Sequence, residues 1–128
     1  MCPYCNRNYV FSKTDADTCD LDHFIQEGKY PIFATSFYNL IPSCPICNRN
    51  KRENEFLFYA HDIKTDIDKK FRFSYTVTSN DFLTNPKSII VDLDADSGYE
   101  NQIDVLNLKK FIKIKMILFV IFFGKIMF

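Results

Sequence analysis

The chain has no tryptophan, no net charge and no apolar run long enough to cross a membrane. Its longest uninterrupted apolar run, Met116 to Phe123, has eight residues, whereas a membrane helix needs about 20. We therefore expect no membrane partner. Sixteen Lys and Arg balance sixteen Asp and Glu, so there is no global basic signal for a polyanionic partner, although local charge governs such contacts.

The cysteines do not form an even set, since there are five. Because Cys2 is already a candidate zinc ligand, we also expect no secretory leader. A secreted disulfide scaffold normally has both features. Reduced thiols and a cytoplasmic location are therefore expected. Cys19 stands alone between the pairs, and we expect it to be a plain small or surface residue.

Four of the cysteines form two C-x-x-C pairs with identical spacing. The pairs are Cys2 with Cys5 and Cys44 with Cys47. Two such pairs separated by a long loop are typical of a structural zinc site, because each tight turn places two thiolates on one tetrahedral ion. The alternatives are a disulfide pair and a thiol redox motif, but the β-α-β setting of a redox motif is absent.

The length of 128 residues fits one domain. We expect strands over 9–14 and 20–25 that pair as a hairpin, a strand over 38–42 and a helix over 48–58. The alternation over 70–78 predicts a half-buried strand. A further strand is expected over 88–93, with a helix starting in 103–108.

We expect the fold class to be α+β, with a small zinc-bound core over residues 1–60. An α+β extension over 61–110 would pack on that core. The apolar tail over 111–128 is expected to be either a buried terminal helix or an out-of-frame translation of the gene. Because Met1 leaves no room before the first cysteine pair, we expect either that an upstream helical segment is missing or that the chain is a fragment of a longer gene.

Charge is uneven along the chain. Residues 44–52 carry Arg49, Lys51 and Arg52 with no acid among them, whereas residues 62–104 hold nine acids against five bases. A surface for a nucleic-acid backbone is therefore expected beside the second cysteine pair.

The remaining motifs carry a resemblance to a known family. Leu21-Asp22-His23-Phe24 lies between the cysteine pairs, Tyr30-Pro31 follows, and Tyr38-Asn39-Leu40-Ile41-Pro42-Ser43 leads into Cys44 and on to Asn48. In these elements the chain resembles the HNH endonucleases, and most closely a bacterial CPYC…LDHF…NLIPSCxxCN subgroup. The resemblance implies a treble-clef-like ββα-metal core, phosphodiester hydrolysis, a role in bacterial defence and an ATPase partner.

The resemblance also implies roles for individual residues. Asp22 and Asn48 would hold one catalytic Mg²⁺ or Mn²⁺ through hard oxygen ligands. His23 would take a proton from the attacking water, and Asn39 would hold the His23 loop. Arg49, Lys51 and Arg52 would contact backbone phosphates. The chain departs from many relatives in Ile25 to Lys29, where Glu27 adds an acid, and in having Asn48 as the final ligand.

The leading hypothesis is thus a metal-dependent HNH endonuclease acting on DNA, ahead of RNA. The alternative is a catalytically inactive, zinc-stabilised nucleic-acid-binding module or a truncated remnant of such an enzyme. Taken singly, His23 would be a structural or zinc-side histidine, and the asparagines would be turn and cap residues. His61 has no partner motif and is expected at the surface.

Overall fold

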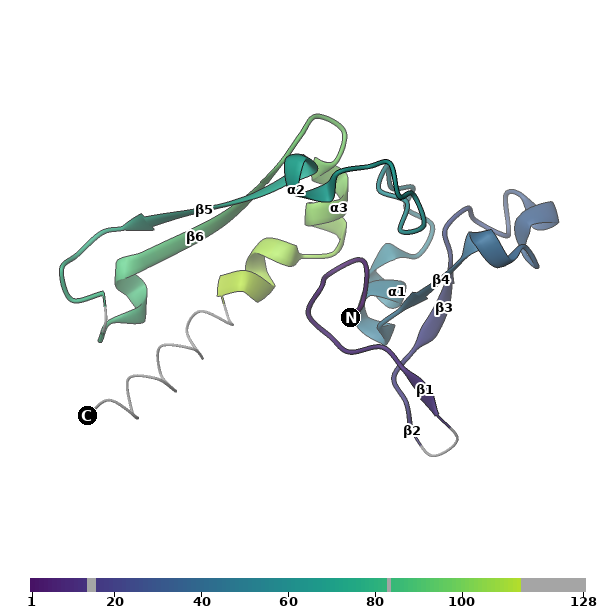
Figure 1. Cartoon of the computed structure of the whole chain (residues 1–128), viewed down its shortest axis with the longest axis horizontal. Coiled ribbons are helices and arrows are strands. Elements are labelled where there is room, and N and C mark those ends of the chain that lie inside the picture. Colours follow the sequence, from purple (N-terminus) through teal and green to yellow (C-terminus); the bar gives the residue numbers. More distant parts are fainter. Residues whose placement is uncertain (14–15, 83, 114–128) are drawn as a thin grey trace. The chain divides into compact units, whose positions relative to one another are not determined.

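A computed structural model describes residues 1–13, 16–82 and 84–113 and divides the chain into two compact units, Met1–Asp66 and Ile67–Phe128 (Figure 1). Most of the predicted apolar tail lies outside the described residues. None of the helices in the described ranges is long and apolar enough to span a membrane. The packing of an extension over 61–110 on the core remains a prediction, and each unit is described by itself.

The first unit contains two small antiparallel ladders and one α-helix. Strand β1 (Ser12–Lys13) pairs with β2 (Ala16–Asp17), and β3 (Asp20–His23) pairs with β4 (Leu40–Ser43). Two 3₁₀ turns, η1 (Pro31–Phe33) and η2 (Phe37–Asn39), lie between β3 and β4, and α1 (Pro45–Lys51) follows β4. The order β3, β4, α1 is a ββα unit.

The predicted hairpin between residues 9–14 and 20–25 is wrong. Asp22 of β3 pairs with Ile41 of β4, and His23 pairs with Leu40. Strand β4, which pairs with β3, carries the Ile41 side chain, and that side chain is completely buried. The local pairing therefore shrinks to the two-residue ladder of β1 and β2.

Helix α1 begins earlier and ends sooner than the predicted range of 48–58. Pro45 occupies the first turn, where its fixed φ suits a helix start and its missing N–H costs nothing. Arg52 ends the helix with a positive φ of 47°, a backbone conformation that breaks helical repetition. Phe56 and Phe58, expected at the helix end, instead contribute to the core from the segment after it.

The core of the first unit is small and built partly of thiols. Its buried apolar members are Cys2, Tyr4, Ile41, Cys44, Cys47, Phe56 and Phe58. The Tyr4 and Phe56 rings meet edge to face with centroids 5.8 Å apart. So few large side chains give limited stabilisation, and a metal held by the buried thiols would add to it.

The second unit is an antiparallel hairpin with short helical segments. It contains α2 (Ile67–Lys70), β5 (Phe71–Val77), η3 (Pro86–Ser88), β6 (Ile89–Ala95) and α3 (Glu100–Val105). Both strands were predicted, and they pair from Phe71 with Ala95 to Val77 with Ile89. The predicted half burial of β5 is wrong, because six of its seven residues are exposed. Burial falls instead on Leu93, Ile103 and Leu106.

A four-thiol metal centre beside a buried polar network

The four paired cysteines form one cluster. Their Sγ atoms all lie within 4.8 Å of one another, and Cys2, Cys44 and Cys47 are buried. Four thiolates at such distances match the tetrahedral geometry and soft ligands that zinc prefers in structural sites. The set of ligands predicted from spacing is thus brought together, and the donor chemistry fits a structural zinc ion.

Hydrogen bonds prepare the cluster for a cation. The Cys44 backbone N–H donates to Cys2 Sγ at 3.3 Å, and the Asn8 amide donates to Cys44 Sγ at 3.3 Å. Contacts with the Cys2 and Cys47 thiols lower the pKa of Cys5, while contacts with Cys2 and Cys5 raise the pKa of Cys47. The cluster therefore favours at least one thiolate, which is the form that binds metal.

The thiol cluster brings distant parts of the unit together beside α1. Cys44 directly follows β4, and Cys47 lies in the first turn of α1 next to Asn48. Cys2 and Cys5 come from the N-terminal turn. A bound ion would thus fix the junction between β4 and α1, and with it the side chains that α1 directs at β3.

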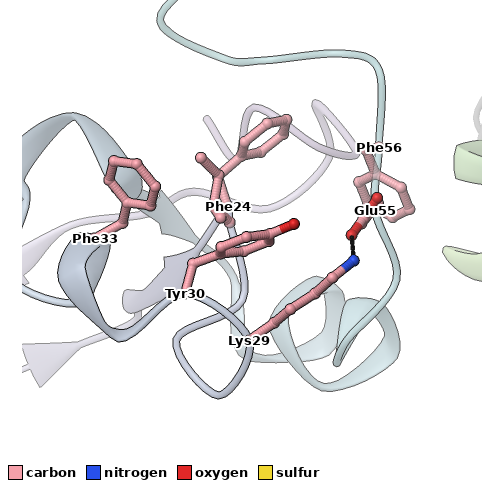
Figure 2. A pocket seen from close by; sticks show the side chains of 7 residues that line it. Phe24, Lys29, Tyr30, Phe33, Glu55 and Phe56 are labelled. Carbon is pink, nitrogen blue, oxygen red and sulfur yellow. Dashed lines mark hydrogen bonds and ion pairs between the residues drawn. The ribbon is translucent and has the colours of Figure 1, made fainter.

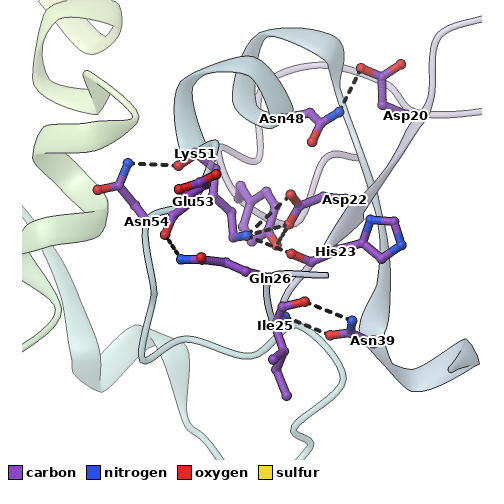
Figure 3. A network of polar contacts seen from close by, with 11 residues as sticks. Asp20, Asp22, His23, Ile25, Gln26, Asn39, Asn48, Lys51, Glu53 and Asn54 are labelled. Atoms are coloured by element: carbon purple, nitrogen blue, oxygen red, sulfur yellow. Dashed lines mark hydrogen bonds and ion pairs between the residues drawn. The ribbon is translucent and has the colours of Figure 1, made fainter. Parts of the chain in front are cut away.

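Helix α1 and strand β3 face each other through two polar pairs (Figure 3). The Asn48 amide donates to Asp20 Oδ2 at 3.1 Å, and Lys51 Nζ lies 3.1 Å from Asp22 Oδ2. Residues two apart lie on one face of a strand, and residues three apart lie on one side of a helix. The 20/22 spacing on β3 therefore matches the 48/51 spacing on α1.

The second pair is buried. Lys51 has no exposed surface and Asp22 is 4% exposed. The Tyr4 hydroxyl also donates to Asp22 at 2.6 Å, and Lys51 Nζ donates to the His23 carbonyl oxygen at 3.0 Å. Burial, followed by the Asp22 charge, raises the pKa of Tyr4. Tyr4 therefore stays protonated and donates a hydrogen bond to this carboxylate.

Lys51, expected to contact phosphates, thus lies inside the unit, and its ammonium is 5.9 Å from the centroids of the Phe24 and Phe56 rings. Arg49 and Arg52 are exposed on α1 and at its end. Sequence reasoning missed the partnership of Lys51 with Asp22 and Tyr4. The three-residue spacing between Asn48 and Lys51 was the available signal.

The His23 side chain points away from the two polar pairs (Figure 3). It follows Asp22 directly, and successive residues of a strand point to opposite faces. His23 Nε2 lies 3.0 Å from the Ala34 carbonyl oxygen and 3.5 Å from a carboxylate oxygen of Glu27. The side chain is 30% exposed, so a solvent molecule or ligand has access to it.

Asn39 clamps the chain segment that follows His23. Its Oδ1 accepts from the Ile25 backbone N–H at 2.7 Å, and its Nδ2 donates to the carbonyl oxygens of Ile25 and Phe33, each at 3.0 Å. Asn39 is buried, and its three bonds are part-buried. A single amide therefore joins the loop after His23 to η1.

Two further residues stay apart from these networks. Cys19 is half-buried, and its thiol lies 3.6 Å from the Asp20 carbonyl oxygen. His61 is exposed and contacts the Leu40 carbonyl and the Tyr59 ring.

Comparison with known proteins adds one match. Residues 2–54 match a family model described as HNH endonuclease. No curated protein and no solved structure matches the chain. The matched span contains all four clustered cysteines and the whole β3, β4, α1 unit.

Proposed function

Because residues 2–54 match the HNH endonuclease family model, we propose that this chain is a metal-dependent endonuclease that hydrolyses phosphodiester bonds in DNA. The family match supports a nuclease-type function, without naming the substrate. The observation that carries the finer proposal is the ββα unit joined to the thiol cluster, since it holds Asp22, His23 and Asn48 on adjoining elements. RNA is the second candidate substrate.

His23 is proposed as the general base. A carbonyl oxygen can only accept a hydrogen bond, so the contact with Ala34 requires that Nε2 carry the proton in neutral imidazole. The lone pair of Nδ1 is then available to accept a proton from the attacking water. The Ala34 contact would thus select the tautomer that the reaction needs.

Asp22 and Asn48 are proposed as the ligands of a catalytic Mg²⁺ or Mn²⁺. Their carboxylate and amide oxygens are hard donors on the facing elements β3 and α1, so the donor chemistry fits. Such an ion would stabilise negative charge on the phosphate and the leaving oxygen. The Asn48 nitrogen is engaged by Asp20, which turns its oxygen away from that carboxylate.

The exposed arginines are proposed to bind the nucleic-acid backbone. Arg49 and Arg52 lie on and just after the helix that carries Asn48, and both are exposed. Guanidinium groups bind phosphates through paired N–H donors. Lys51 would join them only if its contact with Asp22 opened.

The deciding experiment is cleavage of plasmid by the full chain loaded with zinc. With Mg²⁺ or Mn²⁺ the protein should nick or cut, and His23→Ala should lose at least about 100-fold in rate, the usual scale of general-base catalysis. His61→Ala is the matched control and should keep full activity. Zinc content, measured by mass spectrometry, should be equal in all three proteins. Undiminished cleavage by His23→Ala would end the mechanism.

One observation favours the alternative of a nucleic-acid-binding module that does not cut. Both oxygens of Asp22 already have partners, because Lys51 and Tyr4 hold them. If that arrangement persists, no divalent ion binds Asp22. Tight binding of duplex DNA without cleavage, in either Mg²⁺ or Mn²⁺, would select this module.

The resemblance also supports a role in bacterial defence with an ATPase partner. That proposal is tested by co-purification of the tagged chain with an ATPase from its native cells.

A further inference from the structure

A pocket opens beside the segment that follows His23, and the proposed function does not use it. Its volume is about 350 Å³. The lining residues are Phe24, Ile25, Lys29, Tyr30, Phe33, Glu55 and Phe56 (Figure 2). We propose that this pocket binds one unpaired nucleobase of the strand that is cut, an inference that rests on the proposed nuclease function.

The same chain segments hold the pocket and the His23 imidazole. Phe24 and Ile25 follow His23 directly in the chain, and Ala34, whose carbonyl contacts His23 Nε2, follows Phe33. The Asn39 side chain bonds to the backbone of both Ile25 and Phe33. A base in the pocket would therefore be held at a fixed position relative to the proposed general base.

Two aromatic rings of the lining are partly exposed, and Lys29 Nζ lies over the Tyr30 ring, 5.3 Å from its centroid. Tyr30 is 43% exposed and Phe33 is 41% exposed. Their ring centroids are 6.5 Å apart and the rings are tilted by 59°, so neither ring covers the other. Exposed aromatic rings are the surfaces on which unstacked bases pack. Phe56, in contrast, is buried and serves as wall.

An ion pair within the lining favours binding of a base over binding of a phosphate. Lys29 Nζ lies 3.1 Å from Glu55 Oε1, with side chains 55% and 67% exposed. A carboxylate repels phosphate, but it accepts from the amino groups of a base while a lysine donates to ring nitrogen or carbonyl oxygen. An exposed pair adds little to stability, so it can change partners at little cost.

The size of the pocket points to a single base. A volume of about 350 Å³ lies at the low end of small-ligand sites and excludes a duplex. A base within a duplex is stacked and paired, and it must leave the stack to enter a pocket. The inferred substrate therefore has an unpaired or readily extruded nucleotide next to the cleaved bond.

The test uses the fluorescence of 2-aminopurine, an adenine analogue that is quenched by stacking. The full zinc-loaded chain is titrated, without Mg²⁺ or Mn²⁺, into a duplex with one bulged 2-aminopurine and into the same duplex fully paired. Binding should be tighter and quenching stronger for the bulge. Tyr30→Ala and Phe33→Ala should each weaken binding to the bulge by roughly 5- to 150-fold, the scale of one lost stacking contact.

Matched controls come from the second 3₁₀ turn. Phe37 and Tyr38 are more exposed than the pocket rings and do not line it, so Phe37→Ala and Tyr38→Ala should bind the bulge as the parent does. Equal zinc content and circular dichroism should show that all four variants fold. In a competition experiment, free mononucleotides displace the bulged duplex from the protein. Glu55→Gln should change which mononucleotide displaces it best.

Equal affinity for bulged and paired duplex, or equal effects of pocket and control variants, would overturn the inference. Continued plasmid cleavage in that case would leave the nuclease proposal standing. Conversely, if His23→Ala cut plasmid as well as the parent while the pocket variants lost bulge binding, the mechanism would fall and the base site would stand.

Discussion

At the scale of single residues, Lys51 has an unusual environment. Its ammonium lies in the interior against the Asp22 carboxylate, the His23 carbonyl and two aromatic rings. A buried pair of this kind adds little net stability, but removing one partner leaves an uncompensated charge in a medium of low polarity. The Lys51 ammonium also competes with a divalent ion for the Asp22 carboxylate, which is proposed to be a ligand of that ion.

Replacing Lys51 by Met tests the first consequence. The variant keeps much of the side-chain volume but leaves the buried Asp22 charge without its partner. The free energy of unfolding should therefore fall by about 3–5 kcal/mol. The double variant with Asp22→Asn should recover much of that loss, since no charge is then buried alone. Urea unfolding of the zinc-loaded proteins measures both. Full stability of Lys51→Met would contradict the buried pairing.

The same variant tests whether Asp22 is a ligand of the divalent ion or only the buried partner of Lys51. If Asp22 is a cation ligand, loss of the competing ammonium should raise the affinity for Mn²⁺ at least several-fold, measured by electron paramagnetic resonance. Lys64→Met, at an exposed position, serves as the control and should leave affinity unchanged. An affinity that stays the same or falls in folded Lys51→Met would remove Asp22 from the proposed ligand set.

Asn39 gives a second prediction at this scale. Asn39→Ala removes three part-buried hydrogen bonds and leaves the Ile25 N–H without that partner, at a cost of about 1–3 kcal/mol. Cleavage should fall at least about 10-fold because the segment after His23 loses its anchor, while zinc content stays constant. Asn54→Ala, which removes one bond to the Lys51 carbonyl, is the control. Unchanged cleavage by Asn39→Ala would exclude a positioning role.

At the scale of elements, a zinc ion in the thiol cluster would hold the ββα unit together. Metal affinity depends on deprotonated thiols, so lowering the pH favours thiols over thiolates and releases the ion. Chelation or acidification should therefore abolish the proposed nuclease activity, and in NMR spectra the amide signals of β3, β4 and α1 should lose their chemical-shift dispersion. Readdition of Zn²⁺ at neutral pH should restore both. A chelated protein with an unchanged spectrum would show that the ion is not structural.

The elements also show what the sequence could and could not predict. The ligands Cys2, Cys5, Cys44 and Cys47 were predictable because their C-x-x-C spacing is a local constraint. Strands β5 and β6 were predictable from alternation and apolar runs. The pairing of β3 with β4 was not, because burial of Ile41 is a long-range effect that outweighs a nearby hairpin.

The contacts of Lys51 and His23 illustrate a further limit. A cluster of three cations near a cysteine pair indicates a basic surface, yet burial of one of them depends on which face of α1 meets β3. Similarly, the contact between His23 and the Ala34 carbonyl depends on the path of the loop between β3 and β4. Both facts arise only from tertiary packing.

At the scale of the whole molecule, zero net charge limits non-specific attraction to DNA. Contacts would depend on a few local cations, foremost Arg49 and Arg52. Each phosphate contact lowers the slope of log K against log salt by about 0.9. Arg49→Gln and Arg52→Gln should each flatten that slope by about one, measured by fluorescence anisotropy. Arg72→Gln, in the second unit and paired with Asp96, should leave it unchanged.

The backbone of Arg52 has a consequence for how this chain balances stability against binding. A positive φ suits glycine, and an arginine held there costs of order 1 kcal/mol or more. Glycine at this position would ease the strain but would also remove a guanidinium from the helix end. The backbone substitution that relieves this strain would therefore remove one of the two exposed arginines that are proposed to bind a polyanion.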